Sequence, residues 1–168
     1  MASQTFNNIK ELERWINSKH GQNSTLDEAR IRELLIDAGK ELRKFMIEEL
    51  NAYFLSYEPT VYKRTGDTVD SIIVGSPKKL NINEWYLEIT FDEGKAFHKS
   101  YIGSDQPDGY TPWLLEVGWN IEDKVQPSRP MFTDHPGTHY ITKAVNRFNG
   151  SNKHGLKVTV EHNGKRYI

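Results

Sequence analysis

The chain contains no cysteine. This absence excludes disulfides, thiolate nucleophiles and zinc or iron–sulfur sites ligated by cysteine, so any cross-connection has to come from packing or from a partner subunit. The sequence also lacks a stretch of roughly 20 apolar residues, the length that a membrane-spanning helix needs. Residues 1–10 have neither the basic start nor the apolar run of a secretion signal. We therefore expect a protein that assembles in the cytoplasm and is neither secreted nor membrane-bound.

An excess of charge of either sign is missing as well. The formal net charge is -1 at pH 7, and the basic residues form isolated pairs between acidic stretches: Lys63-Arg64, Lys78-Lys79 and Lys165-Arg166. Such pairs do not make the basic stripe that neutralises a phosphate backbone or holds a protein on an anionic membrane. Nucleic-acid binding is therefore disfavoured as the main task.

Several local motifs of catalysis do not occur. The sequence has no G-x-S-x-G nucleophile elbow, no Walker-type phosphate loop, no dinucleotide-binding fingerprint and no H-E-x-x-H zinc motif. The usual local geometries for nucleophilic, phosphoryl-transfer, hydride-transfer and zinc-hydrolase chemistry thus have no signature here. We expect no enzyme activity, no cofactor and no metal.

What the chain does have is the composition of an ordinary globular protein. Of its 168 residues, 36% are hydrophobic and 27% are charged, a balance that predicts a folded chain with one main domain. Four Trp, eight Tyr and seven Phe are many for a mean hydropathy of -0.70. Large aromatic side chains are enriched where subunits meet, which favours oligomerisation, although a private core would use them equally well.

Apolar residues at helical spacing predict three helices. A short amphipathic helix over residues 6–18 precedes a linker with Gly, Asn and Ser, so residues 1–24 form an arm that is mobile or docks on a neighbour. A second helix, over residues 27–56, is longer than one small sheet can cover. Gly39 within it would allow close approach by another backbone. The third helix follows a Thr cap and occupies residues 138–150.

Alternating apolar and polar residues predict a small antiparallel sheet. The expected strands cover residues 71–74, 85–91 and 156–161. An Asn163-Gly164 pair then suits a two-residue hairpin turn into a short edge strand. The fold class is therefore α+β, with the long helix and the C-terminal helix packed on one face of the sheet. The core domain would span residues 25–168 and include a long irregular loop at 93–136 and the C-terminal hairpin.

One cluster of residues could carry chemistry. Asp134, His135 and His139 are close in sequence, and His154 could reach them from beyond the last helix. Two histidines four positions apart share a cation when both lie on one helical face, but Pro136 makes this spacing a turn. A metal-dependent hydrolase is thus the alternative from a different class, and a turn with exposed histidines is the simpler interpretation.

Three segments occur in a characteristic order. They are Tyr62-Lys63-Arg64-Thr65-Gly66 with Ser71-Ile72 behind it, Leu115-Glu116-Val117-Gly118-Trp119, and Arg129-Pro130-Met131-Phe132 before the last helix. Over residues 27–149 the chain resembles the tail-component family of long-tailed bacteriophages. In that family an R-T-G-x-L-x-x-S-I segment follows a long helix, and V-E-x-G-T-like and R-P-F segments precede a C-terminal helix. The chain departs from this pattern at Trp119, where the family often has Thr, and at Met131, which separates Pro130 from Phe132.

Physical chemistry suggests roles for these segments. Gly66 can take a positive φ and turn the chain, while Arg64 can bond carbonyls or a carboxylate near the helix end. Gly118 lets Glu116 and Trp119 project from a tight loop, where an exposed indole beside a carboxylate suits contact with a neighbouring subunit. Turn chemistry inside a monomer is the alternative. The expected interface or motif residues are Arg64, Thr65, Gly66, Glu116, Gly118, Trp119, Arg129, Pro130 and Phe132.

The resemblance implies a virion structural protein of the phage neck that takes part in tail completion. It implies a homo-oligomeric ring of six or twelve copies that joins the capsid connector to the tail tube, with DNA passing through its lumen without sequence-specific binding. Such a ring would assemble in the bacterial cytoplasm and reside in the virion. Head-to-tail contacts that close produce rings, and a near-neutral subunit suits a channel in which DNA slides. A head-closure or minor capsid component is the structural alternative.

Overall fold

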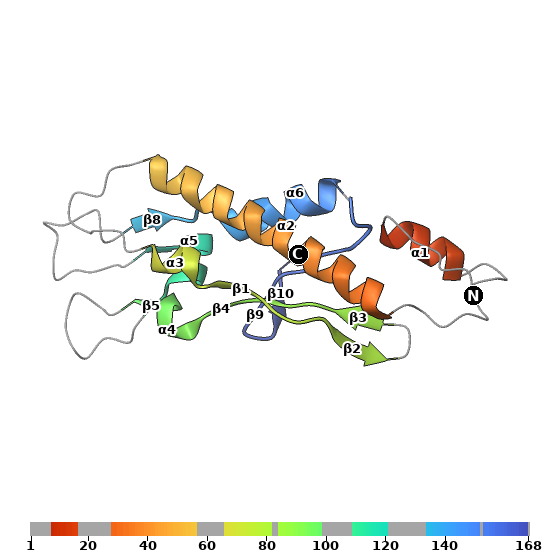
Figure 1. Cartoon of the computed structure of the whole chain (residues 1–168). Coiled ribbons are helices and arrows are strands. Elements are labelled where there is room, and N and C mark those ends of the chain that lie inside the picture. The colour runs from red at the N-terminus through yellow and green to blue at the C-terminus, as the bar shows by residue number, and fades with distance from the viewer. Residues whose placement is uncertain are drawn as a thin grey trace, which may run out of the picture. The chain divides into compact units, whose positions relative to one another are not determined.

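The structure is a computed structural model that describes residues 8–16, 28–56, 66–81, 84–98, 109–120, 134–151 and 153–167 (Figure 1). The helices are α1 (Ile9–Ile16), α2 (Glu28–Leu55), α3 (Asp67–Asp70), α4 (Glu93–Ala96), α5 (Thr111–Val117) and α6 (Tyr140–Ser151). The strands are β1 (Ile72–Val74), β2 (Lys78–Asn81), β3 (Glu84–Tyr86), β4 (Ile89–Phe91), β5 (Phe97–His98), β6 (Gly109–Tyr110), β7 (Gly118–Asn120), β8 (Asp134–Pro136), β9 (Glu161–His162) and β10 (Lys165–Arg166).

The predicted α+β fold class is confirmed. The strands form two-stranded pairs. The pairs β2–β3, β5–β6, β7–β8 and β9–β10 are antiparallel, and β1 pairs with β4. The predicted strand over residues 85–91 is interrupted at 87–88, where the chain leaves β3 before it enters β4. Within the described ranges, no helix is both long and apolar enough to cross a membrane.

Contacts within the chain divide it into two compact units. Unit 1 contains Met1–Phe45, Val74–Ile89 and Val145–Ile168, and unit 2 contains Met46–Ile73 and Thr90–Ala144. This grouping differs from the single core domain that the sequence predicts for residues 25–168. Each unit gathers segments that are distant in sequence, and the two long helices α2 and α6 supply residues to both.

The core of unit 1 is built on the apolar stripe of α2, which confirms the predicted long helix. Its buried α2 side chains recur three and four positions apart, as one helical face requires: Ile31, Leu34, Leu35, Ala38, Leu42 and Phe45. Gly39 does admit a close neighbour, but the neighbours are side chains and not the expected backbone. A Cβ at Gly39 would lie 2.8 Å from Val74 Cγ1 and 2.9 Å from Leu87 Cδ2.

Helix α1 packs on unit 1 of its own chain. Leu12 is buried with Ile31 and Leu35, and Trp15 packs against the same cluster. The part of the predicted N-terminal arm that the structure describes is therefore docked within the chain. Residues 17–27, which include the predicted linker, lie outside the described residues.

The C-terminal segment of unit 1 differs from its prediction in one respect. Residues 156–160 do not form the expected strand. Instead, Asn149 on α6 binds the backbone of Val158 twice: its Oδ1 accepts from the Val158 N–H at 3.0 Å, and its Nδ2 donates to the Val158 carbonyl at 3.1 Å. The predicted hairpin turn is confirmed, because Asn163 and Gly164 both have positive φ, 49° and 72°, between β9 and β10.

Unit 2 gives structure to part of the predicted irregular loop. Between residues 93 and 136 the described chain forms α4, β5, β6, α5, β7 and β8, so the prediction of an irregular stretch is wrong for these residues. The ring of Tyr110 packs against two aromatic neighbours. Its centroid lies 6.1 Å from that of Phe91 and 5.3 Å from that of Phe97. The buried apolar side chains of the unit are Met46, Leu50, Ile72, Ala96, Leu115, Tyr140, Ile141 and Ala144.

Replacing Asn149 by Ala should release residues 156–160 from α6. Both hydrogen bonds to Val158 are lost, so we expect the free energy of unfolding to fall by about 1–3 kcal/mol and the Val158 amide to exchange faster. Urea denaturation and hydrogen exchange measure the two effects. Asn146→Ala, at an exposed position of the same helix, is the matched control; equal losses in both variants would contradict the assigned role of Asn149.

Candidate functional site

The segment Leu115-Glu116-Val117-Gly118-Trp119 is bound to the start of α6 within unit 2. Glu116 is 3% exposed. Its carboxylate accepts from the N–H of Ile141 at 2.7 Å, and from the N–H and hydroxyl of Thr142 at 3.2 and 2.5 Å. The Glu116 side chain thus caps the N-terminus of α6, where free N–H groups and the helix dipole favour a negative charge.

Backbone and hydroxyl contacts reinforce this cap. The Thr138 N–H and its hydroxyl both donate to the Leu115 carbonyl at 2.8 Å, and the His139 N–H donates to the Glu116 carbonyl at 3.1 Å. The Thr138 hydroxyl oxygen also accepts from the Tyr140 N–H at 3.3 Å, as the predicted cap requires. Gly137 makes this contact possible, because a Cβ there would lie 2.5 Å from the Glu116 carbonyl oxygen.

The expectation that Glu116 projects from a loop toward a neighbouring subunit is wrong. A buried carboxylate needs hydrogen-bond donors, and the first turn of α6 supplies them. Its neighbour Val117 faces outward instead and is 46% exposed. Gly118 ends α5 with a φ of 80°, as predicted for a turn, and leads into β7. The backbone of Trp119 pairs with that of His135, but its side chain lies outside the described part of the structure.

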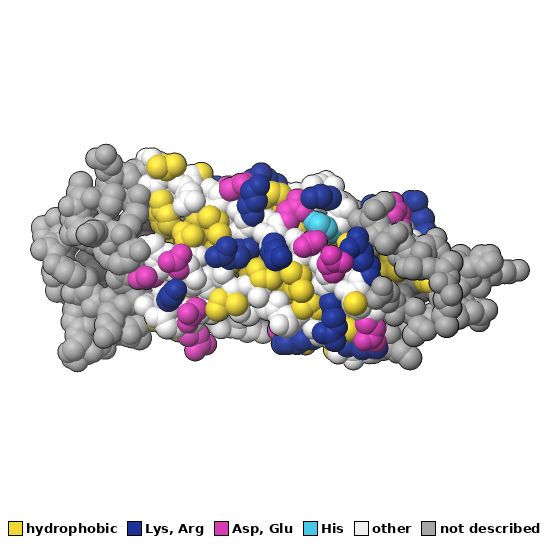
Figure 2. All heavy atoms as spheres, viewed as in Figure 1, with side chains coloured by type: hydrophobic (Ala, Val, Ile, Leu, Met, Phe, Trp, Pro, Cys, Tyr) yellow, Lys and Arg dark blue, Asp and Glu magenta, His cyan; other side chains and the backbone are white. Residues whose placement is uncertain are grey.

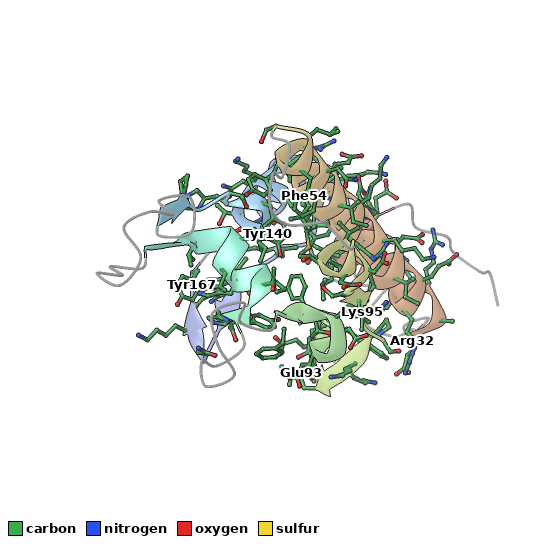
Figure 3. The ribbon with its side chains drawn as sticks, turned by 90° about the vertical axis from the view of Figure 1, so that its left-hand side faces the viewer. Arg32, Phe54, Glu93, Lys95, Tyr140 and Tyr167 are labelled. Carbon is green, nitrogen blue, oxygen red and sulfur yellow. The ribbon has the colours of Figure 1, made fainter. Side chains whose placement is uncertain are left out.

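Next to this cap lies an unsatisfied hydroxyl. Tyr140 is 1% exposed, and its Oη has no hydrogen-bond partner among the described residues. Burial raises the pKa of this phenol well above its ordinary value, and the charges of Glu116 and Tyr110 raise it further. Figure 3 shows Tyr140 in the interior, whereas Glu93 on α4 lies near the lower edge of the view. The Tyr140 side chain is therefore neutral and contributes by packing in the interior. The carboxylate of Glu116 is stabilised by donors of α6 and not by the Tyr140 hydroxyl.

The other motif residues are described only in part. Gly66 has the expected positive φ of 84°, and its carbonyl accepts from the N–H groups of Val69 and Asp70 at the start of α3. Its proposed role in turning the chain is thereby supported. The remaining positions lie outside the described residues: Arg64, Thr65, Arg129, Pro130 and Phe132.

The histidine cluster is also described in part. His139 is exposed and has a φ of 55°. Asp134 and His135 lie in β8, and their side chains are outside the described part of the chain. Among the side chains that the structure does describe, no three His, Cys, Asp or Glu residues are placed to hold a metal ion. A metal site at His139 therefore stays a hypothesis.

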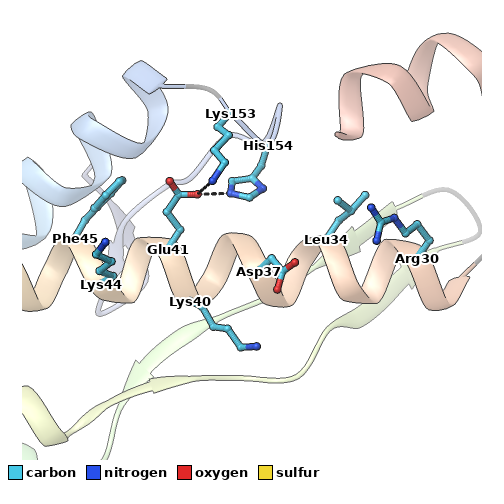
Figure 4. A pocket seen from close by; sticks show the side chains of 9 residues that line it. All are labelled: Arg30, Leu34, Asp37, Lys40, Glu41, Lys44, Phe45, Lys153 and His154. Atoms are coloured by element: carbon cyan, nitrogen blue, oxygen red, sulfur yellow. Dashed lines mark hydrogen bonds and ion pairs between the residues drawn. The ribbon is translucent and has the colours of Figure 1, made fainter. Parts of the chain in front are cut away.

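A second cluster of charged side chains lies in unit 1 and has no signal in the sequence. Glu41 on α2 accepts from Lys153 Nζ at 3.4 Å and is hydrogen-bonded to His154 Nε2 (Figure 4). The imidazole of His154 stacks on Phe148, with ring centroids 5.8 Å apart. The cluster of Glu41, Lys153 and His154 borders a cavity of about 560 Å³, whose further lining residues are Arg30, Leu34, Asp37, Lys40, Lys44 and Phe45. Because Glu41 and His154 are far apart in sequence, only the folded chain reveals the pair.

Charges of both signs share the surface. On the face drawn in Figure 2, Lys and Arg side chains are interspersed with those of Asp and Glu. Several charged side chains of unit 1 form exposed ion pairs, such as Lys78–Glu88 at 2.7 Å and Lys79–Glu28 at 2.6 Å. Lys79 also lies over the ring of Trp85, on which Arg32 stacks as well. Local pairing of opposite charges agrees with the near-neutral net charge of the sequence.

Replacing Glu116 by Ala should destabilise the chain by about 2–4 kcal/mol, because buried N–H groups at the start of α6 lose their acceptor. Glu116→Gln retains one acceptor oxygen and should cost less. Urea denaturation measures both. Lys143→Ala, on the exposed face of the same helix, is the control. A Glu116→Ala variant as stable as this control would show that the cap does not hold α6.

Acid should weaken the Glu41 cluster. Burial acts to raise the pKa of Glu41, but hydrogen bonds from His154 and Lys153 and their charges outweigh it, so the pKa lies below its usual 4.5. The unfolded chain therefore takes up the proton first, and the stability from Glu41 is present above about pH 4.5 and lost as pH falls through the folded pKa.

The variant Glu41→Gln tests this dependence. We expect it to be less stable than the wild type by about 1–2 kcal/mol at pH 7, with a difference that shrinks below about pH 4.5. Urea denaturation between pH 3 and 7 measures the difference. Parallel stability curves over the whole range would contradict the assigned role of the carboxylate.

No protein-family model matches the chain, and searches of curated proteins and of solved structures find no similar protein. The likeness of the three sequence segments to the phage tail-component family therefore stays a hypothesis that rests on those segments alone.

Proposed function

We propose that the chain is a structural protein of the bacteriophage neck that acts in tail completion and forms a homo-oligomeric ring. The ring joins the capsid connector to the tail tube, and DNA passes through it without sequence-specific binding. Its role is non-catalytic and depends on shape and on adhesion between subunits. A head-closure or minor capsid protein is the nearest alternative, because it would use the same kind of contact.

One observation carries the proposal. The segment Leu115–Trp119, which bears the resemblance, is fixed on its inner side and presents an apolar side chain on its outer side. Leu115 and Glu116 are buried, while Val117 is 46% exposed. A surface residue on a rigid support loses little conformational entropy when it binds, so it suits a subunit contact.

Further exposed apolar side chains accompany Val117 in unit 2. Leu55 at the end of α2 is 86% exposed, Phe97 in β5 is 47% exposed and Ile73 in β1 is 44% exposed. Apolar side chains gain free energy when they leave water, at about 25 cal/mol per Å² of buried area. Contacts between copies of the chain would supply that burial. Such contacts are head-to-tail when different patches meet, and they close into a ring when the rotation permits.

The mass of the purified full-length chain is the first test. Light scattering behind a sizing column, with negative-stain imaging of the peak, should find a closed ring of six or twelve copies. A monomer at all concentrations, both alone and with phage connector and tail-tube proteins, would overturn the proposal. Hydrolytic activity that requires added metal and is lost in His139→Ala would instead favour the hydrolase alternative.

Val117→Lys should weaken the ring without weakening the fold. A lysine at the C-terminal turn of α5 agrees with the helix dipole, so we expect the unfolding free energy to stay within about 0.5 kcal/mol of wild type. The lysine charge would be buried in the contact between subunits, so the mass of the assembly in solution should fall toward that of a monomer. Thr90→Lys, at an exposed position of β4, is the control and should leave the ring intact. A full ring in Val117→Lys would show that Val117 does not belong to the interface.

A further inference from the structure

Helix α1 depends on its docking site for its structure. It spans only 8 residues, Ile9–Ile16, and isolated helices shorter than about 12–15 residues are marginal in water. Leu12, at 7% exposed, is its buried anchor and lies against Ile31 and Leu35 of α2. Other apolar side chains complete the site: Trp85, Leu87 and Leu156. The helix is therefore held by contacts that residues outside it provide.

The second part of the docking site is the turn after α6. The His154 carbonyl accepts from the Ile9 N–H at 3.3 Å, and Gly155 packs against Lys10 and Ile9. Through its side chain, His154 is bound in turn to Glu41 of α2. The turn that receives α1 is thus fixed to α2 by groups that do not belong to α1. The contact between Glu41 and His154 is therefore the same whichever copy supplies α1.

The connection between α1 and α2 is long for a helix–helix link. It runs from residue 17 to residue 27, whereas about 2–8 residues are usual between helices of a bundle. Fully extended, a segment of this length would reach roughly 36–40 Å at 3.3–3.6 Å per residue. That reach is about the diameter of a small domain, so the connection permits α1 to bind at the site of another copy.

We propose that α1 is exchanged between copies and forms the link from each subunit to the next. The occupant of the Leu12 site in the assembly is α1 of a second copy of this chain. The contacts are the same in both arrangements, so the exchange needs no new complementary surface. Each copy has one α1 to donate and one site to accept it, and such links close head to tail. This inference rests on the homo-oligomer proposed above, and it identifies the contact that joins its subunits.

Disulfide trapping tests the exchange against a clean background, because the chain has no cysteine. A Cβ at Gly155 would lie 3.7 Å from the Cβ of Ile9, within the range that a disulfide spans. Full-length Ile9→Cys and Gly155→Cys chains are mixed in denaturant, refolded together and oxidised. We expect a disulfide-linked dimer of one chain of each kind on a non-reducing gel. Each variant alone should give no such dimer.

The doubly substituted chain separates the outcomes further. Exchange predicts linked species from dimer up to the whole ring. A ring of normal mass whose disulfides all lie within single chains would overturn the exchange while leaving the proposed function in place. A chain that stays monomeric, with its disulfide internal, would overturn both.

Leu12→Asp provides a test that needs no disulfide, since Gly155 has a φ of +70° that strains other residues. A buried aspartate should expel α1 from the site, and we expect folded monomers on the sizing column in place of the ring. Glu13→Gln, at an exposed position of α1, is the matched control and should keep the ring. An intact ring in Leu12→Asp would overturn the exchange even if the cysteine variants failed to fold.

Discussion

The apolar stripe of α2 has to be covered, and both units depend on how it is covered. Helices in proteins gain most of their stability from packing of the apolar face, so a long amphipathic helix gathers partners along its length. In unit 1 these partners include Leu12 of α1 and the side chains of Trp85, Leu87 and Leu156. The guanidinium of Arg147 on α6 lies 4.0 Å from the centre of the Phe45 ring. In unit 2 the same helix buries Met46 and Leu50. Segments distant in sequence are thus brought to one scaffold.

A buried carboxylate organises unit 2 in a comparable way. Glu116 leaves water only because Ile141 and Thr142 supply donors at the start of α6. This arrangement joins the end of α5 to the start of α6 and fixes the backbone that continues into β7. A residue of this motif can therefore act from the inside: Glu116 fixes the support, and the neighbouring Val117 is the exposed side chain.

Local signals predicted the parts of the fold that local physics determines. The period of 3.6 in α2, the cap at Thr138 and the Asn163-Gly164 turn all match the structure. The misses involve contacts between distant residues. Alternation at 156–160 predicted a strand, but Asn149 binds the Val158 backbone in place of a neighbouring strand. The predicted outward orientation of the Glu116 side chain is wrong because its hydrogen-bond donors lie some 25 positions away in the sequence. The pair of Glu41 and His154 had no sequence signature for the same reason.

The proposed assembly uses two contacts of different physical character. Val117 sits on a support with several hydrogen bonds, so it can contribute to binding without reorganisation. Helix α1 is the opposite case, since a short helix held mainly by Leu12 is stable only where a site receives it. A subunit that carries both can align through the rigid surface and then be retained by the arm of its neighbour. A copy retained by the arm of its neighbour cannot diffuse away. The effective concentration of its remaining contact surfaces near that neighbour is therefore raised, which strengthens every further contact in the ring.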